Sequence, residues 1–488
     1  MENNEKQESL FAGILKYSIS TWANLIIGFL SVIITTRILL PDVYGMISIF
    51  LSATNFLMYL VTFGMDGAYI RFYNEPPKEN TKNQILYKVI IISTCICIIF
   101  GVVCVGIYYE DISMYIFGIK SRLLMCMVSI YVFSQAVLRY LNINFRMGFK
   151  VRQYNIQNIM ISCLSRVLII VAALLMNEAT FIISAVSIGT AVVLCFYLFI
   201  QRKEMIPFSE SGRVCFSLSL KHYGDFFRFA LFSAPTYFVT YFNSFAGQQI
   251  IREALGAYKL GVFSSCGMFS SIFTALKGGF ATYWSAYVYK NHASEKKRIA
   301  DMHNYVLLFA ILFSSVLVIM RDIVFIAIGK EYHESKQFFS LLLLMPVLSF
   351  VLETTDKGIA LAKKNEIVLF THVVSAASNI LGCMVLIPLF GIIGAAYANA
   401  LSAIILYAAN TIFGQRYYRT INNPIKSVIA TGLIILLMLI PSFLSEIAII
   451  IGLTFVLDVL TYFLFRAECS FLILKCRQYL KVMFAKKG

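Results

Sequence analysis

Long runs of apolar residues recur along the whole chain, and they constrain the fold more than any other feature. Each is about as long as the 20 or so residues that an α-helix needs to cross a bilayer. Hydrophobic residues make up 59% of the 488 and charged residues only 14%, too much apolar surface for a water-soluble fold. We therefore predict an all-α polytopic membrane protein. Its fourteen predicted transmembrane segments are residues 12–36, 43–66, 89–109, 121–143, 154–176, 179–200, 226–249, 260–284, 303–320, 338–357, 367–387, 392–412, 426–440 and 446–465.

Lysine and arginine are distributed unevenly between the loops that connect these segments. The loops on the side of the N-terminus carry most of them, and the basic tail at 466–488 falls on the same side. The opposite loops carry few, such as Arg37, Lys120 and Arg252. Because basic loops stay in the cytoplasm, both termini are predicted to be cytoplasmic. The tail is interpreted either as an interfacial helix on the anionic leaflet or as a frayed basic end.

The net charge of +16 does not indicate a nucleic-acid partner, because the basic residues are scattered between apolar runs. Neither the 11 cysteines nor the five histidines show the spacing of metal ligands. The histidines are expected in loops or at helix ends, apart from His372 in the eleventh span. The chain contains no nucleotide-binding loop and no nucleophile elbow. We therefore expect no catalytic residue, no metal and no cofactor.

The second half of the chain resembles the first, with six predicted spans in each. Residues 37–41 align with 252–256, and Gly45 aligns with Gly261 after one inserted residue. Because six is even, the two units have the same orientation, a parallel repeat that is common in alternating-access transporters. The predicted organisation is two pseudo-symmetric six-helix lobes and a C-terminal helix pair. The predicted domains are an N-terminal lobe (1–200), a cytoplasmic linker (201–225), a C-terminal lobe (226–412), two extra transmembrane helices (413–465) and a basic cytoplasmic tail (466–488).

Polar residues follow helical spacing along five of the predicted spans. In the second span they recur at intervals of three and four from Ser48 to Asp66, so that they share one helix face. A single stripe of this kind usually packs against a neighbouring helix. Five stripes, together with Arg166 and Lys277 inside spans, favour a water-filled cavity, because ionisable groups at that depth normally line one or pair with each other. The other polar residues singled out in these stripes are Asn24, Asn55, Asn158, Tyr237, Tyr241 and Gln248.

The charged residues inside the spans suggest two roles. Arg166 and Lys277 are the first candidates for contacting an anionic group such as phosphate. Asp66, Glu353 and Asp356 are candidates for proton or sodium coupling. An alternative remains open for these acids, which is that they serve only as ion-pair partners of Arg71, Arg139 and Lys357.

Three short motifs connect this reading with a known family. Residues 40–45 read Leu-Pro-Asp-Val-Tyr-Gly, and the segment from Gly64 to Tyr73 contains Ala-x-x-Arg-Phe ending in Arg71-Phe72. Near the twelfth span, Gly391 and Gly394 precede two alanines. Together, in this order, they resemble the Wzx-type polysaccharide flippases of the multidrug/oligosaccharidyl-lipid/polysaccharide (MOP) exporter superfamily. The residues that carry the resemblance are Leu40, Pro41, Tyr44, Gly45, Arg71, Gly391 and Gly394.

The resemblance implies a flippase that moves a polyprenyl-pyrophosphate-linked oligosaccharide from the cytoplasmic to the outer leaflet of the bacterial inner membrane by alternating access. Arg166 and Lys277 would then hold pyrophosphate or acidic sugars, while the polar stripe residues would hydrogen-bond or stack on sugars. The partners implied are the lipid-linked glycan, membrane lipids and, as a further expectation, a glycan polymerase or glycosyltransferases. Glycan identity and the coupling ion are left open.

Three alternatives remain. A cation-coupled multidrug exporter of the same superfamily would prefer an acidic cavity over a basic one. A flippase for the peptidoglycan precursor would share the present architecture. A membrane glycan polymerase is expected to carry a sizeable catalytic loop outside, whereas the predicted external loops are all short.

Overall fold

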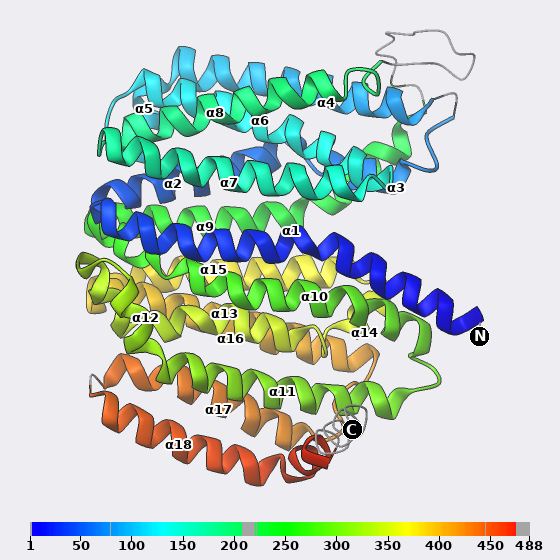
Figure 1. Cartoon of the computed structure of the whole chain (residues 1–488), viewed down its shortest axis with the longest axis vertical. Coiled ribbons are helices and arrows are strands. Elements are labelled where there is room, and N and C mark those ends of the chain that lie inside the picture. The colour runs from blue at the N-terminus through cyan, green and yellow to red at the C-terminus, as the bar shows by residue number, and fades with distance from the viewer. Residues whose placement is uncertain (1, 79, 207–219, 221, 445, 475–488) are drawn as a thin grey trace, which may run out of the picture. The chain divides into compact units, whose positions relative to one another are not determined.

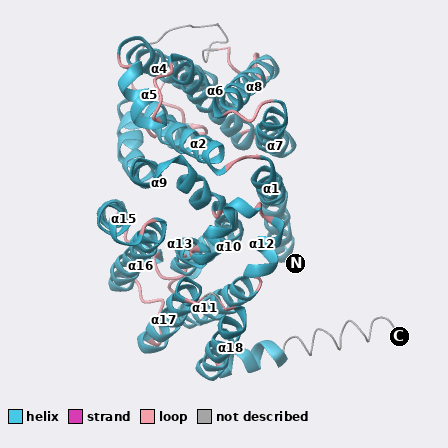
Figure 2. Ribbon diagram, turned by 90° about the vertical axis from the view of Figure 1, so that its left-hand side faces the viewer, coloured by secondary structure: helices cyan, strands magenta, loops and turns pink. Residues whose placement is uncertain are grey.

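The computed structural model describes residues 2–78, 80–206, 220, 222–444 and 446–474. Over these residues the chain folds into helices joined by short connections (Figure 1), with no strand among them. The prediction of an all-α protein is therefore confirmed. The helices form two compact units: residues 1–268 with 328–332, called unit 1, and residues 269–327 with 333–488, called unit 2. Figure 2 shows the helices of each unit nearly end-on.

In the described part of unit 1 there are nine α-helices and one π-helical segment. They are α1 (Glu2–Ile38), α2 (Pro41–Thr62), α3 (Met65–Phe72), α4 (Lys82–Gly101), η1 (Val102–Ile107), α5 (Tyr109–Phe117), α6 (Arg122–Met147), α7 (Val151–Leu175), α8 (Ala179–Ile200) and α9 (Gly224–Ser265). Within it α2 packs along α9, α6 along α8 and α1 along α7. The packing is aromatic between α2 and α9, where Phe56 contacts the rings of Phe238, Phe242 and Phe245.

The remaining helices of the described chain lie in unit 2, except that the first residues of α10 and of η2 belong to unit 1. They are α10 (Gly267–Asn291), α11 (Lys296–Ile319), α12 (Arg321–Ala327), the 3-10 helix η2 (Lys330–Gln337), α13 (Phe339–Leu352), α14 (Lys357–Leu361), α15 (Asn365–Phe390), α16 (Ile392–Tyr417), α17 (Pro424–Phe443) and α18 (Ile447–Leu464). Helix α15 packs along α16, and α17 and α18 pack on α11. Rings join α10 to its neighbours, because Phe269 contacts Phe339 edge-on and Phe273 contacts Phe313.

Eleven helices of the described chain are long and apolar enough to cross a membrane. Two bent pairs, α9 with α10 and η2 with α13, raise the number to thirteen if each pair is one span. This confirms a multi-pass membrane protein. The α9–α10 pair covers two of the predicted spans, and the predicted total of fourteen stays a prediction.

The predicted loop between the seventh and eighth spans is wrong, because residues 250–255 continue α9. The direction of the chain changes at a single residue, Gly256, whose φ of 85° and ψ of 170° are not helical. A residue with a Cβ rarely adopts this conformation, so glycine allows a sharp break without a loop. Gly256 aligns with Pro41 of the first half, and the one inserted residue lies between Gly256 and Gly261.

The polar face predicted from Ser48 to Asp66 on one continuous helix is also wrong at its end. Helix α2 ends at Thr62, and Phe63 and Gly64 both adopt left-handed conformations, with φ of 42° and 72°. Asp66 therefore belongs to the short helix α3, which starts in a new direction. At the other end of α2, Pro41 occupies the first turn, where its missing N–H costs no hydrogen bond.

The boundary between the two compact units lies at Met268, downstream of the predicted linker. Helix α9 packs with unit 1 because its aromatic residues face α2. The two units are defined by contacts, whereas the lobes were predicted from the similarity between the two halves of the sequence. The units therefore do not test the lobe boundaries, which remain predictions.

Candidate functional site

A cavity of about 390 Å³ with both polar and apolar side chains in its wall lies inside unit 1, and Arg166 is one of the residues that line it. Helices α1, α2, α6, α7 and α8 contribute to its wall. Its polar lining comes from Arg166 and from the hydroxyl and amide groups of Ser31, Thr35, Tyr44, Ser48, Tyr131, Gln135, Ser162 and Ser165. The described lining includes no aspartate or glutamate. The cavity therefore has one fixed positive charge and no fixed negative charge.

Arg166 reaches this position because α7 packs closely on α1. A Cβ atom at Gly28 would lie 3.1 Å from Nη2 of Arg166, so glycine leaves room for the guanidinium. Nη1 of Arg166 donates a long hydrogen bond of 3.4 Å to the backbone carbonyl of Asn24. The Oδ1 atom of Asn24 is buried without a hydrogen-bond partner. Asn24 therefore contacts Arg166 through its backbone carbonyl and not through its side chain.

The predicted tyrosines of α9 form a stack with α2. The ring of Tyr59 lies 4.2 Å from that of Tyr241 and 5.8 Å from that of Tyr237, centroid to centroid, and both pairs are nearly parallel. The hydroxyl of Tyr59 also donates to that of Tyr241 over 3.3 Å. Tyr237 is 56% exposed, so this stack has one open end.

A partly buried ion pair lies next to the tyrosine stack. The guanidinium of Arg139 contacts Oδ2 of Asp66 at 2.6 and 2.8 Å. The same guanidinium lies 5.0 Å from the centre of the Tyr59 ring, a distance typical of a cation–π contact. Asp66 is therefore an ion-pair partner of Arg139. Arg71 pairs instead with Glu75, four residues on, at the surface.

The remaining predicted polar residues occupy separate positions. Gln248 of α9 accepts a hydrogen bond of 3.2 Å from Ser48 of α2. Asn158 is half-buried on α7, and Asn55 is exposed on α2. Asn55 and Asn158 are not among the residues that line the Arg166 cavity.

The glycines of the predicted motifs lie where backbones approach closely. A Cβ atom at Gly45 would meet the carbonyl oxygen of Ala257 at 2.1 Å, and one at Gly394 would meet that of Leu386 at 2.1 Å. Gly391 has a positive φ of 61° and ends α15. Leu40, in contrast, is 49% exposed. The three glycine positions therefore exclude larger residues for reasons of backbone packing or conformation, independently of any substrate.

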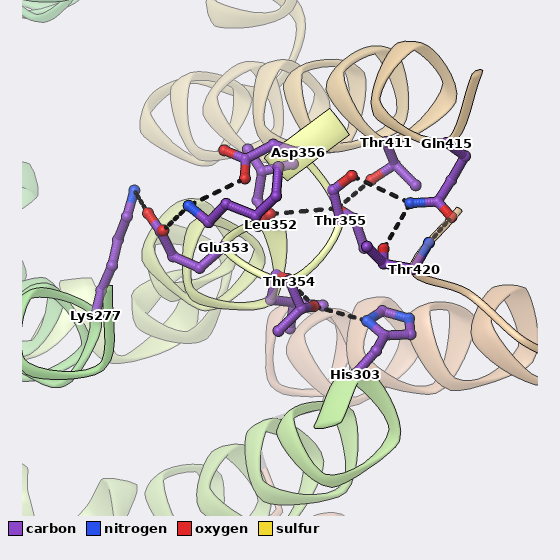
Figure 3. A network of polar contacts seen from close by, with 12 residues as sticks. Lys277, His303, Leu352, Glu353, Thr354, Thr355, Asp356, Thr411, Gln415 and Thr420 are labelled. Carbon is purple, nitrogen blue, oxygen red and sulfur yellow. Dashed lines mark hydrogen bonds and ion pairs between the residues drawn. The ribbon is translucent and has the colours of Figure 1, made fainter. Parts of the chain in front are cut away.

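A cluster of four charged groups lies in unit 2, where α13 ends (Figure 3). The ammonium of Lys357 lies 2.6 Å from one oxygen of Glu353 and 3.3 Å from Asp356. The ammonium of Lys277, from α10, lies 3.5 Å from the other oxygen of Glu353. Lys277 is therefore held less tightly than Lys357, and Glu353 is shared by two cations.

Asp356 and Lys357 lie beyond the last residue of α13, and burial acts on their pKa values in opposite directions. It raises the pKa of Asp356, and the neighbouring Glu353 adds to this, although Lys357 opposes it. Burial alone would lower the pKa of Lys357, but the carboxylates of Asp356 and Glu353 outweigh it, so the pKa of Lys357 is raised. The raised pKa means that the carboxyl of Asp356 binds a proton at a less acidic pH than an ordinary aspartate does.

A smaller cavity of about 170 Å³ opens beside the cluster. Lys277 and Asp356 line it together with His372 of α15 and the amides of Asn365 and Asn410. The structure thus brings Lys277 and Asp356 to one cavity, and it brings Arg166 to another. No group of three or more residues suited to hold a metal occurs in the described part of the chain.

A histidine that its sequence pattern did not mark as buried lies beside this cluster. His303 lies inside α11 and is fully buried, so its expected place at a helix end is wrong. Its Nδ1 lies 2.8 Å from the hydroxyl of Thr354, and its Nε2 lies 2.9 Å from that of Ser427 (Figure 3). The hydroxyl of the next residue, Thr355, lies 2.8 Å from that of Thr411. In the sequence, the only sign that Thr354 and Thr355 belong to a polar site is their position between Glu353 and Asp356.

Comparison with known proteins identifies the family. A family model described as "Polysaccharide biosynthesis protein" matches residues 10–289. The chain belongs to this family. No curated protein matches the chain.

Solved structures share its fold. The structure entitled "Lipid II flippase MurJ, inward closed conformation" matches with a TM-score of 0.70 at 15% identity, over 94% of this chain and 99% of that one. A multidrug resistance MATE family transporter of the MOP superfamily matches in an inward-facing conformation, with a TM-score of 0.53 at 15% identity, over 83% and 97%. The outward-facing conformation of such a transporter matches with a TM-score of 0.57 at 11% identity, over 83% and 94%. The chain therefore belongs to the polysaccharide biosynthesis family, and its fold is that of the MurJ and MATE structures.

Proposed function

We propose that the protein flips a polyprenyl-pyrophosphate-linked oligosaccharide from the cytoplasmic to the outer leaflet of the bacterial inner membrane by alternating access. The observation that carries the proposal is the Arg166 cavity, which has a guanidinium and hydroxyl groups but no carboxylate in its described lining. A guanidinium binds phosphate oxygens through two parallel hydrogen bonds, so this cavity suits an anionic cargo. The serine and tyrosine hydroxyls around it suit sugar hydroxyl groups.

The same observation weighs against the multidrug exporter. A cavity that selects cationic drugs needs negative charge, because a buried positive charge repels them. The acidic residue nearest the tyrosine stack, Asp66, is already neutralised by Arg139 at 2.6 Å. The fixed charge of the described cavity in unit 1 is therefore positive.

The coupling role is assigned to the cluster in unit 2. Of the three predicted acids, Asp66 is held by Arg139, and Glu353 is shared by Lys277 and Lys357. Asp356 lines the smaller cavity, and its pKa is raised by burial. We assign proton exchange to Asp356. Lys277, the more loosely held cation, is the group in this cavity that an anion would contact.

Depletion of the protein tests the proposal. Intact lipid-linked oligosaccharide should accumulate in the inner leaflet, and surface polysaccharide should be lost, because synthesis continues while translocation stops. Both quantities are measured in the same cells, with re-expression of the wild-type chain as the control. Unchanged precursor and unchanged surface glycan would contradict the proposal and direct attention to drug efflux.

A second cargo is the peptidoglycan precursor, which the fold likeness to the MurJ flippase favours. The same depletion experiment separates the two cargoes. Accumulation of the peptidoglycan precursor, with cell lysis and unchanged surface polysaccharide, would support this second cargo.

A further inference from the structure

Residues 328–332, called the strap, belong to one unit by packing and to the other by chain connection. They are packed in unit 1, whereas the residues on both sides, up to Ala327 and from His333, belong to unit 2. The strap connects α12 to the 3-10 helix η2 and includes the first residues of η2. Ile328 and Tyr332 are buried.

The strap is bound to the turn between α1 and α2. Tyr332 is 0% exposed, and its hydroxyl donates a hydrogen bond of 2.9 Å to the carbonyl oxygen of Leu39. Its ring meets that of Tyr44 edge-on, with centroids 5.7 Å apart. At the other end of the strap, a Cβ atom at Gly329 would lie 1.9 Å from the carbonyl oxygen of Thr36. The strap therefore contacts this turn through a ring, a hydrogen bond and a close backbone approach.

The turn has a physical need for such a partner. Helix α1 ends at Ile38 and α2 begins at Pro41. Carbonyl groups at the end of a helix have no partner within that helix, and leaving one buried without a partner is costly. The hydroxyl of Tyr332 satisfies the carbonyl of Leu39, so this bond is lost whenever the strap leaves its site.

The same turn is held from a second side by the segment after Gly256. A Cβ atom at Gly261 would lie 1.8 Å from the carbonyl oxygen of Pro41, and one at Gly45 would lie 2.1 Å from that of Ala257. The motif residues Pro41, Tyr44 and Gly45 thus all lie in contacts of this turn. Tyr44 also lines the Arg166 cavity, as do Thr35 and Leu39.

We infer that the strap is a latch that keeps the Arg166 cavity closed at the α1–α2 turn, with Tyr332 as the gating residue. Both ends of the strap are joined covalently to unit 2, so a movement of α12 and η2 away from the turn must pull Tyr332 from its site. When the latch is released, Tyr44 loses its contact with the ring of Tyr332, and the carbonyl of Leu39 loses its hydrogen-bond donor. The inference rests on the alternating-access part of the proposed function but not on the nature of the cargo.

A labelling experiment without cargo tests the latch. The full-length protein, with its native cysteines replaced, carries Thr35→Cys as a buried reporter that lines the cavity. The rate of its modification by a water-soluble maleimide is measured in membranes. Tyr332→Phe keeps the ring and removes one hydrogen bond, so the rate should rise about fivefold. Gly329→Ala forces the strap away from Thr36, so the rate should rise about tenfold or more.

Tyr140→Phe is the matched control. Tyr140 is a fully buried tyrosine of the same unit, and its hydroxyl lies 2.8 Å from that of Ser93. This variant loses a comparable hydrogen bond and should leave the labelling rate unchanged. A labelling rate for Tyr332→Phe equal to that of the protein with an unchanged strap would overturn the latch. So would a rise in Tyr140→Phe as large as the rise in Tyr332→Phe. If Gly329→Ala does not fold, Tyr332→Phe alone decides. No result of this assay depends on which lipid is carried, so it is separable from the depletion experiment.

Discussion

At the scale of single residues, the charge on Arg166 sets the class of cargo that the cavity can accept. Arg166→Ala should reduce surface polysaccharide at least about tenfold, because a hydrogen bond to a charged group contributes about 1.5–3 kcal/mol. Arg166→Lys should retain part of the activity, since it keeps the charge but loses the paired donors. The measurement is surface glycan per unit of protein in the membrane. Arg122→Ala, which alters an exposed arginine outside the cavity, is the control. Full activity of Arg166→Ala would remove this residue from cargo binding.

Asp356 allows a prediction about pH. Because its pKa is raised in the folded protein, the folded state binds more protons than the unfolded state between the ordinary and the raised value. Stability from this group is therefore present at low pH and is lost as the pH rises through the raised pKa. The thermal midpoint of Asp356→Asn should fall less over this interval than that of the wild type. Parallel curves for the two proteins would show that Asp356 does not titrate there.

Much of the charged chemistry was predictable from the sequence, because a charge inside an apolar run is conspicuous. Arg166 and the acids were found in this way, but the pair of Glu353 and Lys357 forms across the turn between α13 and α14 and not along one helix. His303 was missed, since nothing nearby in the sequence announces Thr354 and Ser427 as its partners. The bond between Tyr332 and Leu39 joins residues 293 positions apart, a separation that local pattern cannot bridge.

At the scale of elements, the helices were predictable and their breaks were not. Glycine is tolerated inside membrane helices, so Gly64, inside the predicted span 43–66, did not differ in sequence from other glycines in spans. Gly256 lay in a predicted loop, but nothing in the sequence indicated that the loop would reduce to this one residue. Only their backbone conformations, with φ of 72° and 85°, distinguish them. The length and hydropathy of each run, by contrast, follow directly from the thickness of the bilayer.

The break at Gly256 gives a second kind of prediction. Gly256→Ala should destabilise the protein by about 1–3 kcal/mol, because an alanine at this φ and ψ is strained. No atom lies within 4 Å of the added Cβ, so the cost comes from the backbone alone. Gly432→Ala, a helical glycine of α17 that also has open space, should be neutral or stabilising. The midpoint of thermal unfolding in detergent is compared for the two variants, and equal midpoints would argue against strain at Gly256.

At the scale of the whole molecule, the loop charges predict its orientation in the membrane. A reporter enzyme active only in the cytoplasm should be active when fused after Gly488, and inactive when inserted at Glu334, in the loop between the ninth and tenth spans. The reason is the excess of lysine and arginine in the loops on the side of the termini. A reporter active only outside serves as the reciprocal control. Activity of the cytoplasmic reporter at Glu334 would invert the predicted orientation.

The contact between Gly45 and Gly261 has a form normally seen between subunits. Each glycine faces the carbonyl four residues before the other, Pro41 in one case and Ala257 in the other. In a symmetric homodimer, residue i touches residue j and residue j touches residue i in the same way. Here a single polypeptide makes both halves of such an isologous contact. If the predicted repeat arose by duplication, two copies of a half-length chain would have made this contact with each other before gene fusion joined them.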